Sequence, residues 1–501
     1  MKRLSKSRYQ KGLQCERALW LTVHNPSVAD PITESQQWIF DQGSTVGQLA
    51  QSLFPGGVEV TEDHFQTAQA LVRTQELIAS GAAVLYEPAF EFNNVLVRVD
   101  ILVRVEPGVW DLYEVKSASS AKEQFVTDAA IQTYVVEGAG LSVRTANVVH
   151  IDNQYVHDGG EYDPAKIFAI VDVTDEARLH IVGVPDMLGY MQQMLTGPEP
   201  DIRIGSRCRK PYTCSFAGHC HAFLPSENPI TDLPRLSEKA CNALLDAGIL
   251  AIDHIPSGFA GLSDNQARVV EVVRSGKPEI NAEGLHKDLG ALQWPVKHLD
   301  FETIMPALPL WAGVRPYEAV PFQYSIHIHE QDGSVSHREF LAPAGEDPRR
   351  ALAQRMLEDL GDSGSIIHYS SYERKILTAL SDWLPEMQSE FEAVMGRMFD
   401  LEKMVRARLK HPLDCGRTSI KFVLPAWCPE LTYSELDVKD GQTASVRYLR
   451  MAMGLLDEQE AQKLNEDLLD YCRLDTYATV RLLEESRRFA DEWVSGRSRG
   501  A

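Results

Sequence analysis

The sequence has no apolar run approaching the ~20 residues that a membrane-spanning helix needs. Its first residues are basic, but no apolar segment followed by a cleavage site comes after them, so no signal peptide is expected. No internal repeat is present either. These absences exclude a membrane-spanning protein and favour the cytoplasm as the compartment.

An excess of basic residues is also missing, since the formal net charge is −22. This charge excludes a protein that coats nucleic acid by charge alone, but it allows an enzyme that grips nucleic acid locally and holds metal ions with carboxylates. The first twenty residues depart from the average, with a local excess of basic side chains over Glu16. The basic residues there are Lys2, Arg3, Lys6, Arg8, Lys11 and Arg17. They predict either a solvated tail or, together with "RCRKPY" at 207–212, contacts to phosphate groups.

The length of 501 residues predicts two or more domains, because single cores stop growing at roughly 250–300 residues. Residues 1–225 mix helical patterns with a strand cluster at 83–117 and end in a cysteine-rich segment. Residues 226–290 carry short amphipathic helical patterns and predict a helical linker, similar to a helix–hairpin–helix. Residues 291–501 return to α/β patterning and end in a long helix near 457–490. The predicted fold class is α/β, with two α/β domains.

A first group of polar residues lies in the strand cluster. In "VLVRVDILVRV" (95–105) the valines and Ile101 alternate with polar residues, which predicts one half-buried strand. After the turn "EPG", the segment "VWDLYEVK" places Glu114 and Lys116 on one face. A hairpin therefore brings Asp100 beside Glu114 and Lys116, where two carboxylates could hold Mg²⁺ and an ammonium could offset charge on phosphate. The alternative is an exposed salt bridge on a hairpin.

The Asp…Glu-x-Lys arrangement resembles the PD-(D/E)xK nuclease superfamily, in particular its RecB-like members. The resemblance implies that Asp100 and Glu114 are metal ligands and that Lys116 is the catalytic lysine. The following segment "DAAIQTYVV" resembles the family's later helix, with Gln132 and Tyr134 in the matching places. The family often has an upstream metal-ligating histidine, and "DQGSTVGQLAQSLF" (41–54) has none.

Four of the eight cysteines form a pattern typical of a metal centre rather than disulfides in a cytosolic chain. Cys208, Cys214 and Cys220 lie in "CRKPYTCSFAGHC", and Cys15 stands far upstream. This arrangement resembles the iron–sulfur RecB-like exonucleases, including the CRISPR-associated ones. It implies that four thiolates hold a [4Fe–4S] cluster, although the spacing after Cys208 differs from the family's C-x-x-C.

Two alternatives remain for the cysteines. His219 and His221 flank Cys220 and keep a Zn²⁺ site open. The remaining cysteines are scattered and are predicted to be buried structural thiols. They are Cys241, Cys415, Cys428 and Cys472.

A third group lies in the C-terminal domain. "HLDFET" resembles the first motif of the DnaQ-like (DEDD) exonucleases, whose ribonuclease-H-like sheet carries Asp-x-Glu on its first strand, here Asp300 and Glu302. "PFQYSIHIHEQDGSVSHREFLAP" predicts the hairpin that such a fold contains. "SGSIIHYSSYERKILTAL" resembles the second motif, with Glu373 where the family has aspartate. In "LLDYCRLDTYATVRLL", Tyr471 and Asp475 share a helix face and match the Tyr-x-x-x-Asp form of the last motif.

Two further residues fall where related proteins have motifs. Asp400 in "MFDLEKMVRARL" and Lys421 in "GRTSIKFVLP" are equally compatible with a helix cap and a solvated surface.

The whole pattern resembles a bacterial family that pairs an iron–sulfur RecB-like nuclease domain with a DnaQ-like, DEDDy-type exonuclease domain. The resemblance implies hydrolysis of phosphodiester bonds that depends on Mg²⁺ or Mn²⁺, with 3′→5′ cleavage at the second site. DNA is favoured over RNA as the substrate, in DNA repair, processing or anti-phage defence. The alternatives are an RNA exonuclease, and a nucleic-acid-binding scaffold of a defence or repair complex in which one or both sites are inactive.

Overall fold

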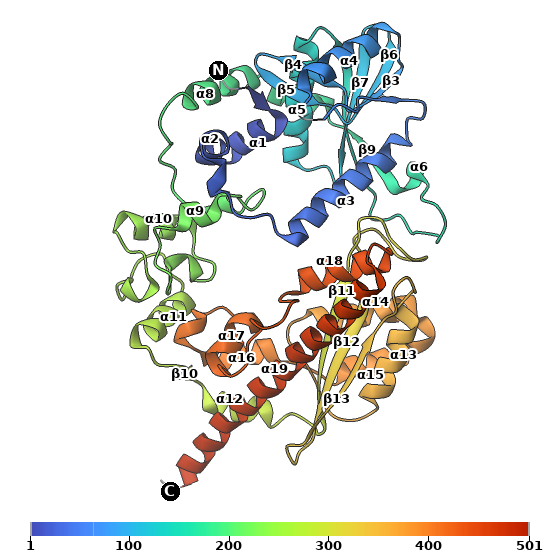
Figure 1. The fold of residues 1–501 in the computed structure, drawn as a ribbon. Coiled ribbons are helices and arrows are strands. Elements are labelled where there is room, and N and C mark those ends of the chain that lie inside the picture. Colours follow the sequence, from blue (N-terminus) through green and yellow to red (C-terminus); the bar gives the residue numbers. More distant parts are fainter. Residues whose placement is uncertain (1–2, 64, 499–501) are drawn as a thin grey trace. The chain divides into compact units, whose positions relative to one another are not determined.

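The computed structural model describes residues 3–63 and 65–498 and divides the chain into two compact units. The first comprises Met1–Phe223 and Pro306–Tyr317, and the second Leu224–Met305 and Glu318–Ala501. The first change of unit, after Phe223, falls close to the predicted boundary at 225. Both units combine helices with mixed sheets, so the predicted α/β class is confirmed (Figure 1). No helix in the described part of the chain is long and apolar enough to cross a membrane.

The N-terminal unit is built on a mixed six-stranded sheet. In spatial order its strands are β2 (Val58–Glu59), β3 (Val84–Tyr86), β6 (Ile101–Glu106), β7 (Val109–Lys116), β8 (Ser142–Ile151) and β9 (Phe168–Asp172). A smaller sheet consists of β1 (Leu4–Ser5), β5 (Val95–Arg98) and β4 (Ala89–Phe92). The helices are α1 (Lys6–Gln14), α2 (Glu16–His24), α3 (Glu34–Gln51), α4 (Thr67–Ala79), α5 (Glu123–Gly138), α6 (Pro164–Ile167), α7 (Thr174–Ile181), α8 (Val184–Met194) and α9 (Ala217–His221).

Two expectations for this unit need correction. The single strand predicted for 95–105 is two strands, β5 and β6, which belong to different sheets and are separated at Val99 and Asp100. The valines alternate through the break in the sequence, but in β6 the adjacent Ile101 and Leu102 are both buried and Val103 and Val105 are half-buried. From residue 3 onward the basic N-terminus is not a solvated tail, since Leu4, Tyr9 and Leu19 are buried in the core of the unit. Lys2 lies outside the described residues.

The C-terminal unit is built on a five-stranded sheet. In spatial order its strands are β13 (Val335–Leu341), β12 (Val320–His329), β11 (Val296–Ile304), β14 (Ile366–His368) and β15 (Met398–Asp400). Numbered along the chain, this is the order 3-2-1-4-5, with β11 in the centre. β12 and β13 form the hairpin expected around "QDGS", and β14 and β15 run parallel to β11.

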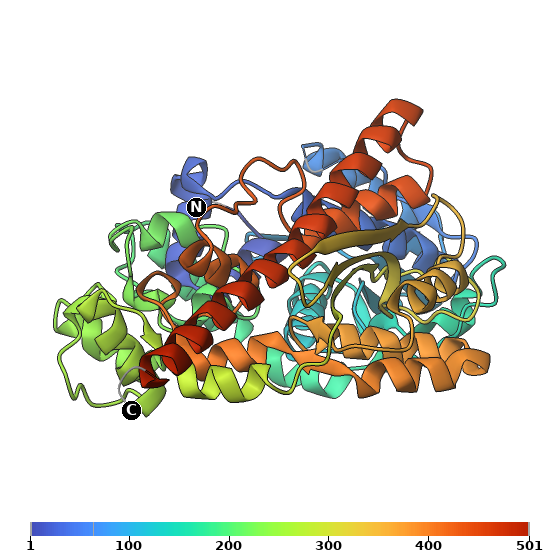
Figure 2. The same ribbon diagram turned by 90° about the horizontal axis from the view of Figure 1, so that it is seen from below.

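Helices cover both faces of this sheet. The helices of the C-terminal unit are α10 (Glu238–Asp246), α11 (Asp264–Ser275), α12 (Ala282–Leu289), α13 (Arg349–Leu360), α14 (Tyr372–Trp383), α15 (Gln388–Gly396), α16 (Leu401–Arg408), α17 (Ile420–Trp427), α18 (Gly441–Ala452) and α19 (Glu458–Ser498). Figure 2 shows the sheet between the long helix α19 on one side and α13–α15 on the other. Leu299 and Phe301 of β11 pack toward α13–α15, so the intervening residues face α19.

The segment predicted as a linker, 226–290, packs as part of the C-terminal unit. It contains α10, α11 and α12, as its helical patterns predict, and one short strand that was not expected, β10 (Glu279–Ile280). β10 pairs antiparallel with β16 (Leu409–Lys410). α10 and α11 begin at the side-chain caps Ser237 and Ser263.

Candidate functional site

The first group of acids gathers at one end of the N-terminal sheet. Asp100 precedes β6, and the antiparallel pairing of β6 with β7 places Ile101 opposite Tyr113. The Asp100 carboxylate accepts a hydrogen bond from the Val115 backbone N–H (2.6 Å). The predicted meeting of Asp100 with Glu114 and Lys116 therefore occurs, through the β6–β7 hairpin.

Glu114 is the centre of this group and is 99 % buried. One of its oxygens lies 2.7 Å from the Lys6 Nζ and 2.7 Å from the Lys116 Nζ. The other oxygen accepts a hydrogen bond from Gln132 on α5. Lys116 also lies 2.6 Å from Asp128. The Gln132 Oε1 is buried and has no hydrogen-bond partner among the described residues, so the group contains an acceptor that a bound water or ligand could satisfy.

Burial and neighbouring charges shift the pKa values of the two carboxyl groups, Asp100 and Glu114, in opposite directions. Burial and the neighbouring Glu114 raise the pKa of Asp100 to about 8. Burial alone would raise the pKa of Glu114, but the ammonium groups of Lys6 and Lys116 outweigh it and lower that pKa to about 2. At neutral pH the metal-free group therefore keeps a proton on Asp100, which a divalent cation would have to displace.

Sequence patterns had missed Lys6 and Asp128 as members of this site. Lys6 lies 108 residues from Glu114, and its only sequence signal was the basic start of the chain. Tyr134, expected beside Gln132, instead accepts a hydrogen bond from Asn93 (3.1 Å) and contacts the Phe92 ring.

The four cysteines of the second group line one small cavity in the same unit. Cys15 is the N-cap of α2, Cys208 ends a short 3-10 helix (Ser206–Cys208), Cys214 lies in the loop before α9, and Cys220 lies on α9. Burial, and the neighbouring thiols, raise the pKa of Cys214 and of Cys220. Four partly buried thiols around one cavity suit a metal centre, because a bound cation would stabilise their thiolates.

No three of the four described sulfurs lie as close together as the ligands of a single zinc ion do. Zn²⁺ with metal–sulfur bonds of ~2.3 Å brings its thiolates within ~3.8 Å of one another. Across the described ranges, the cysteines contribute no trio of ligand atoms within 4.8 Å in this unit. Neither His219 nor His221 lines the cavity, and the ring of His221 faces the Ala217 carbonyl (2.6 Å) instead. Four cysteine thiols are the donor set that a [4Fe–4S] cluster needs, and a four-cysteine zinc site uses the same set.

The third group begins on the central strand of the C-terminal sheet. Asp300 and Glu302 occupy alternate positions of β11 on the face toward α19. The pairing with β12 shifts register directly after Glu302, which is typical of strands at functional sites. Oxygens of Asp300 and Glu302 and the Sγ of Cys472 lie within 4.8 Å of one another. The expected pair is present, and Cys472, expected to be a structural thiol, lies beside it.

Glu373 is brought toward this group by a sharp turn between β14 and α14. Ser370 in that turn has a φ of 127°, a conformation that is strained for a residue with a side chain. Its hydroxyl accepts from the Tyr372 N–H (3.1 Å) and lies 3.5 Å from the Glu373 carboxylate. Glu373 is 97 % buried and acts electrostatically on Asp300. The first turn of α14 thus brings the Glu373 carboxylate within electrostatic range of Asp300.

Asp475 joins the group from α19, held by two phenols. Tyr433, in the loop after α17, donates a hydrogen bond to Asp475 Oδ1 (2.5 Å). Tyr471, one turn before Asp475 on the same helix, also hydrogen-bonds to it. The sequence predicted Tyr471 but missed Tyr433, which carries no motif and lies 42 residues away.

The acids of this group repel one another in a buried setting. Burial and the charges of Asp475, Glu373 and Glu302 raise the pKa of Asp300 well above its usual range. Burial and Asp475 do the same to Glu302. Burial raises the pKa of Asp475 to about 6, against the opposing hydrogen bonds of the two tyrosines. Carboxylates gathered in this way are the ligands that Mg²⁺ and Mn²⁺ prefer, and a divalent cation would remove the repulsion.

The two uncertain motif residues differ in their surroundings. Asp400 caps α16, since its carboxylate accepts the Lys403 N–H (2.8 Å), and the helix-cap interpretation is confirmed. Lys421 donates to the Lys439 carbonyl (3.0 Å), and its ammonium acts electrostatically on Glu302 and Asp475. Lys421 is therefore close enough to the acids to contribute positive charge.

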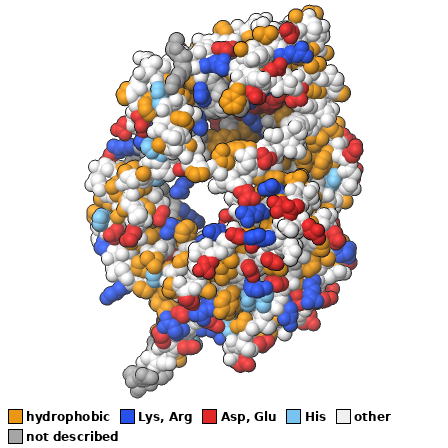
Figure 3. Space-filling view, in the orientation of Figure 1, with side chains coloured by type: hydrophobic (Ala, Val, Ile, Leu, Met, Phe, Trp, Pro, Cys, Tyr) orange, Lys and Arg blue, Asp and Glu red, His pale blue; other side chains and the backbone are white. Residues whose placement is uncertain are grey.

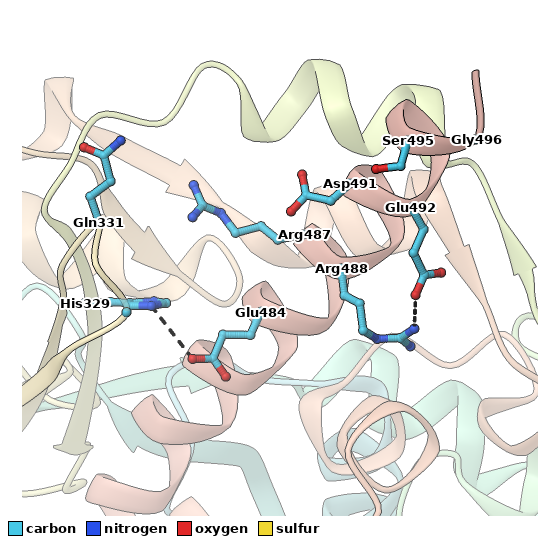
Figure 4. A pocket seen from close by; sticks show the side chains of 10 residues that line it. His329, Gln331, Glu484, Arg487, Arg488, Asp491, Glu492, Ser495 and Gly496 are labelled. Atoms are coloured by element: carbon cyan, nitrogen blue, oxygen red, sulfur yellow. Dashed lines mark hydrogen bonds and ion pairs between the residues drawn. The ribbon is translucent and has the colours of Figure 1, made fainter. Parts of the chain in front are cut away.

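A separate hollow lies between the tip of the β12–β13 hairpin and the C-terminal half of α19, with a volume of about 730 Å³ (Figure 4). Arg487 lies twelve residues beyond Asp475, or about 18 Å along the helix. Arg488 in the hollow lies 2.7 Å from Glu492, so these two charges compensate each other, whereas His329 lies 3.8 Å from Glu484 and burial lowers its pKa. Figure 3 likewise shows acidic and basic side chains intermixed over the visible face of this unit. The hollow is distinct from the acid group.

One family model matches the chain, described as a domain of unknown function (DUF2779), and it covers residues 297–419. The matched segment contains Asp300, Glu302 and Glu373, and it ends before Tyr433, Tyr471 and Asp475. A search of the curated proteins gave no match.

Proposed function

We propose that the protein is a metal-dependent DNA nuclease with two hydrolytic sites, one in each unit, and with a [4Fe–4S] cluster in the N-terminal unit. The observation that carries the proposal is the pair Asp300 and Glu302 on β11, with buried carboxylates of two further elements, Glu373 on α14 and Asp475 on α19, acting electrostatically on Asp300. Such a group is costly to fold without cations, so a role in holding them explains it. The 3-2-1-4-5 strand order with the acids on the central strand agrees with the resemblance to DnaQ-like exonucleases.

In the C-terminal site, Mg²⁺ or Mn²⁺ would polarise the phosphodiester and offset charge on the attacking and leaving oxygens. The chain's own residues orient the reaction. The phenols of Tyr433 and Tyr471 hold the Asp475 carboxylate by hydrogen bonds, and Tyr471 is placed to position the attacking water. Lys421 supplies positive charge near Glu302 and Asp475.

In the N-terminal site, Asp100 and Glu114 are the proposed ligands, and Gln132 orients Glu114. The Lys116 ammonium, held by Glu114 and Asp128, is placed to offset charge that develops on phosphate. Lys6 contacts the same Glu114 oxygen as Lys116, so its ammonium has to move when a cation binds there. Four cysteine thiolates would hold the cluster, whose role here is to join α2 to the loop before α9.

The test is cleavage of end-labelled single- and double-stranded DNA and RNA by the full chain with Mg²⁺, Mn²⁺ or EDTA. Variants Glu114→Gln and Asp300→Asn each remove one ligand at nearly constant shape, and Glu106→Gln and Asp470→Asn are exposed controls. We expect metal-dependent cleavage of DNA, a partial loss in each ligand variant and complete loss in the double variant. Shortening from the 3′ end that disappears only in Asp300→Asn identifies the C-terminal site.

Absence of metal-dependent cleavage for every substrate would contradict the proposal and favour the scaffold alternative. Cleavage of RNA but not of DNA would assign the RNA exonuclease alternative instead. Full activity in the double variant would show that the acids do not carry the reaction.

A further inference from the structure

Cys472 is the residue of the C-terminal acid group that the proposed chemistry does not use. It is fully buried, on α19 between Tyr471 and Asp475. Its Sγ lies within 4.8 Å of a carboxylate oxygen of Asp300 and of one of Glu302. By contrast, Cys428 of the same unit packs in a hydrophobic cluster with Val423 and Leu424, as a structural thiol does.

Glu302 provides a second, independent sign of a ligand. Its side chain is 94 % buried, and no described residue donates a hydrogen bond to its carboxylate. A buried carboxylate without a donor is costly unless a cation or water satisfies it. The Glu302 oxygen lies within 4.8 Å of the Cys472 sulfur. A cation or water bound to the Glu302 carboxylate would therefore also lie next to the thiol.

We propose that Asp300, Glu302 and Cys472 form a mixed oxygen–sulfur site that takes a thiophilic divalent cation of the Zn²⁺ class in competition with Mg²⁺. This proposal rests on the proposed role of the two carboxylates and adds a third donor and a metal preference. Thiolate donors favour Zn²⁺ and its chemical relatives, whereas carboxylates alone suit Mg²⁺ and Mn²⁺. The single sulfur therefore decides which cation the site prefers.

The geometry needs only a small adjustment. A cation bound at ~2.3 Å to sulfur and at ~2.1 Å to oxygen, with tetrahedral angles, separates these donors by about 3.6 Å. Donor atoms that already lie within 4.8 Å reach that separation by movements of about 1 Å or less, within the reach of a glutamate rotamer. Asp475, three residues after Cys472 on the same face of α19, is placed to supply a fourth donor.

Co²⁺ is a suitable probe, because a cobalt–thiolate bond gives a near-ultraviolet charge-transfer band that carboxylate ligands do not give. The full-length wild type, Cys472→Ala, Cys472→Ser and the control Cys428→Ala are titrated with Co²⁺ and, separately, with Mg²⁺. The four cysteines of the N-terminal unit are unchanged in all four proteins, so their contribution cancels in the differences. Mg²⁺-dependent DNA cleavage is measured in parallel.

We expect both Cys472 variants to lose one cobalt–thiolate band relative to the wild type and to Cys428→Ala. The ratio of Co²⁺ affinity to Mg²⁺ affinity should fall by roughly tenfold or more, as for other losses at metal sites. Equal bands and equal ratios in wild type and Cys472 variants would overturn the inference, as would the same loss in Cys428→Ala. If the protein cleaves DNA with Mg²⁺ but the cobalt–thiolate bands of wild type and Cys472 variants are equal, only the inference about Cys472 is refuted. If the bands differ but no cleavage occurs, only the proposed nuclease function is refuted.

Cadmium NMR of the wild-type chain tests the site without any variant, and so does not depend on whether the variants fold. A resonance between those of all-oxygen and all-sulfur cadmium sites supports the mixed site. A spectrum that contains only all-sulfur and all-oxygen resonances overturns it.

Discussion

Replacing Asp475 by asparagine should stabilise the metal-free protein. If the Asp475 carboxylate stabilised the fold instead, the same substitution would destabilise the protein. Asp475 is buried, and its pKa is raised from 3.8 to about 6. A carboxyl group with a raised pKa in the folded state contributes its full stability below pH ~4 and loses it as the pH rises through ~6. At about pH 8, a shift of about two units costs about 3 kcal/mol of folding free energy.

Asparagine has nearly the same shape, carries no charge and keeps an oxygen that can accept the Tyr433 hydrogen bond. In EDTA at about pH 8, the C-terminal unit of Asp475→Asn should therefore gain up to about 3 kcal/mol, and about half of this gain should remain near pH 5. Scanning calorimetry should show the corresponding transition raised by roughly 6–12 °C.

With added Mg²⁺ the transition of the wild type should lie above that of Asp475→Asn, because only the wild type has all of the carboxylates that bind Mg²⁺. The control is Asp470→Asn on the same helix, whose side chain is 62 % exposed; its transition should change by less than about 1 °C in either condition, as for most surface substitutions. If Asp475→Asn instead lowers the transition in EDTA at about pH 8, Asp475 belongs to a stabilising hydrogen-bond network. The argument that the acid group is held against its own repulsion would then be wrong.

Three further predictions concern other residues. Lys6→Met removes the ammonium that contacts Glu114. Because a nearby unit charge is worth a few kcal/mol, half-saturation of the N-terminal site should then need roughly tenfold less Mg²⁺. An unchanged Mg²⁺ affinity in calorimetric titration would show that Lys6 does not compete with the cation. Cys15→Ser should lose the visible absorption of an iron–sulfur protein after reconstitution, whereas Cys241→Ser should keep it; retention in Cys15→Ser contradicts the cluster assignment. Tyr433→Phe removes a hydrogen bond that lowers the pKa of Asp475. Because the carboxyl group then keeps its proton to higher pH, Mg²⁺ binding should weaken most below about pH 7. A loss of Mg²⁺ affinity that does not depend on pH would indicate that Tyr433 has a structural role only.

The parts of the sites that follow from the sequence are those set by local periodicity. Glu114 and Lys116, like Asp300 and Glu302, are two residues apart on a strand and so share a face whatever the rest of the fold does. The hairpin of β6 and β7 has a short connection, so Asp100 could also be placed beside Glu114.

What could not be predicted depends on contacts between distant segments. Lys6 reaches Glu114 across 108 residues, and Tyr433 reaches Asp475 from a loop with no periodic pattern. Cys472 is a neighbour of Tyr471 in the sequence, but only the packing of α19 on β11 shows that its sulfur faces the acids. The break at Val99 was hidden for a different reason: the valines alternate in the sequence through strands that belong to two sheets.

The two acid groups differ in how the chain itself balances their negative charge, and we therefore expect them to depend differently on a bound cation. In the N-terminal unit, Lys6 and Lys116 each lie 2.7 Å from Glu114, so the chain itself neutralises much of the negative charge. In the C-terminal unit, Lys421 acts on the acids electrostatically while its ammonium hydrogen-bonds elsewhere. We therefore expect the C-terminal group to depend more strongly on the proposed cations, and its fold and its proposed chemistry to respond together to metal removal. The N-terminal group should remain folded without metal, because its lysines already offset the charge of Glu114.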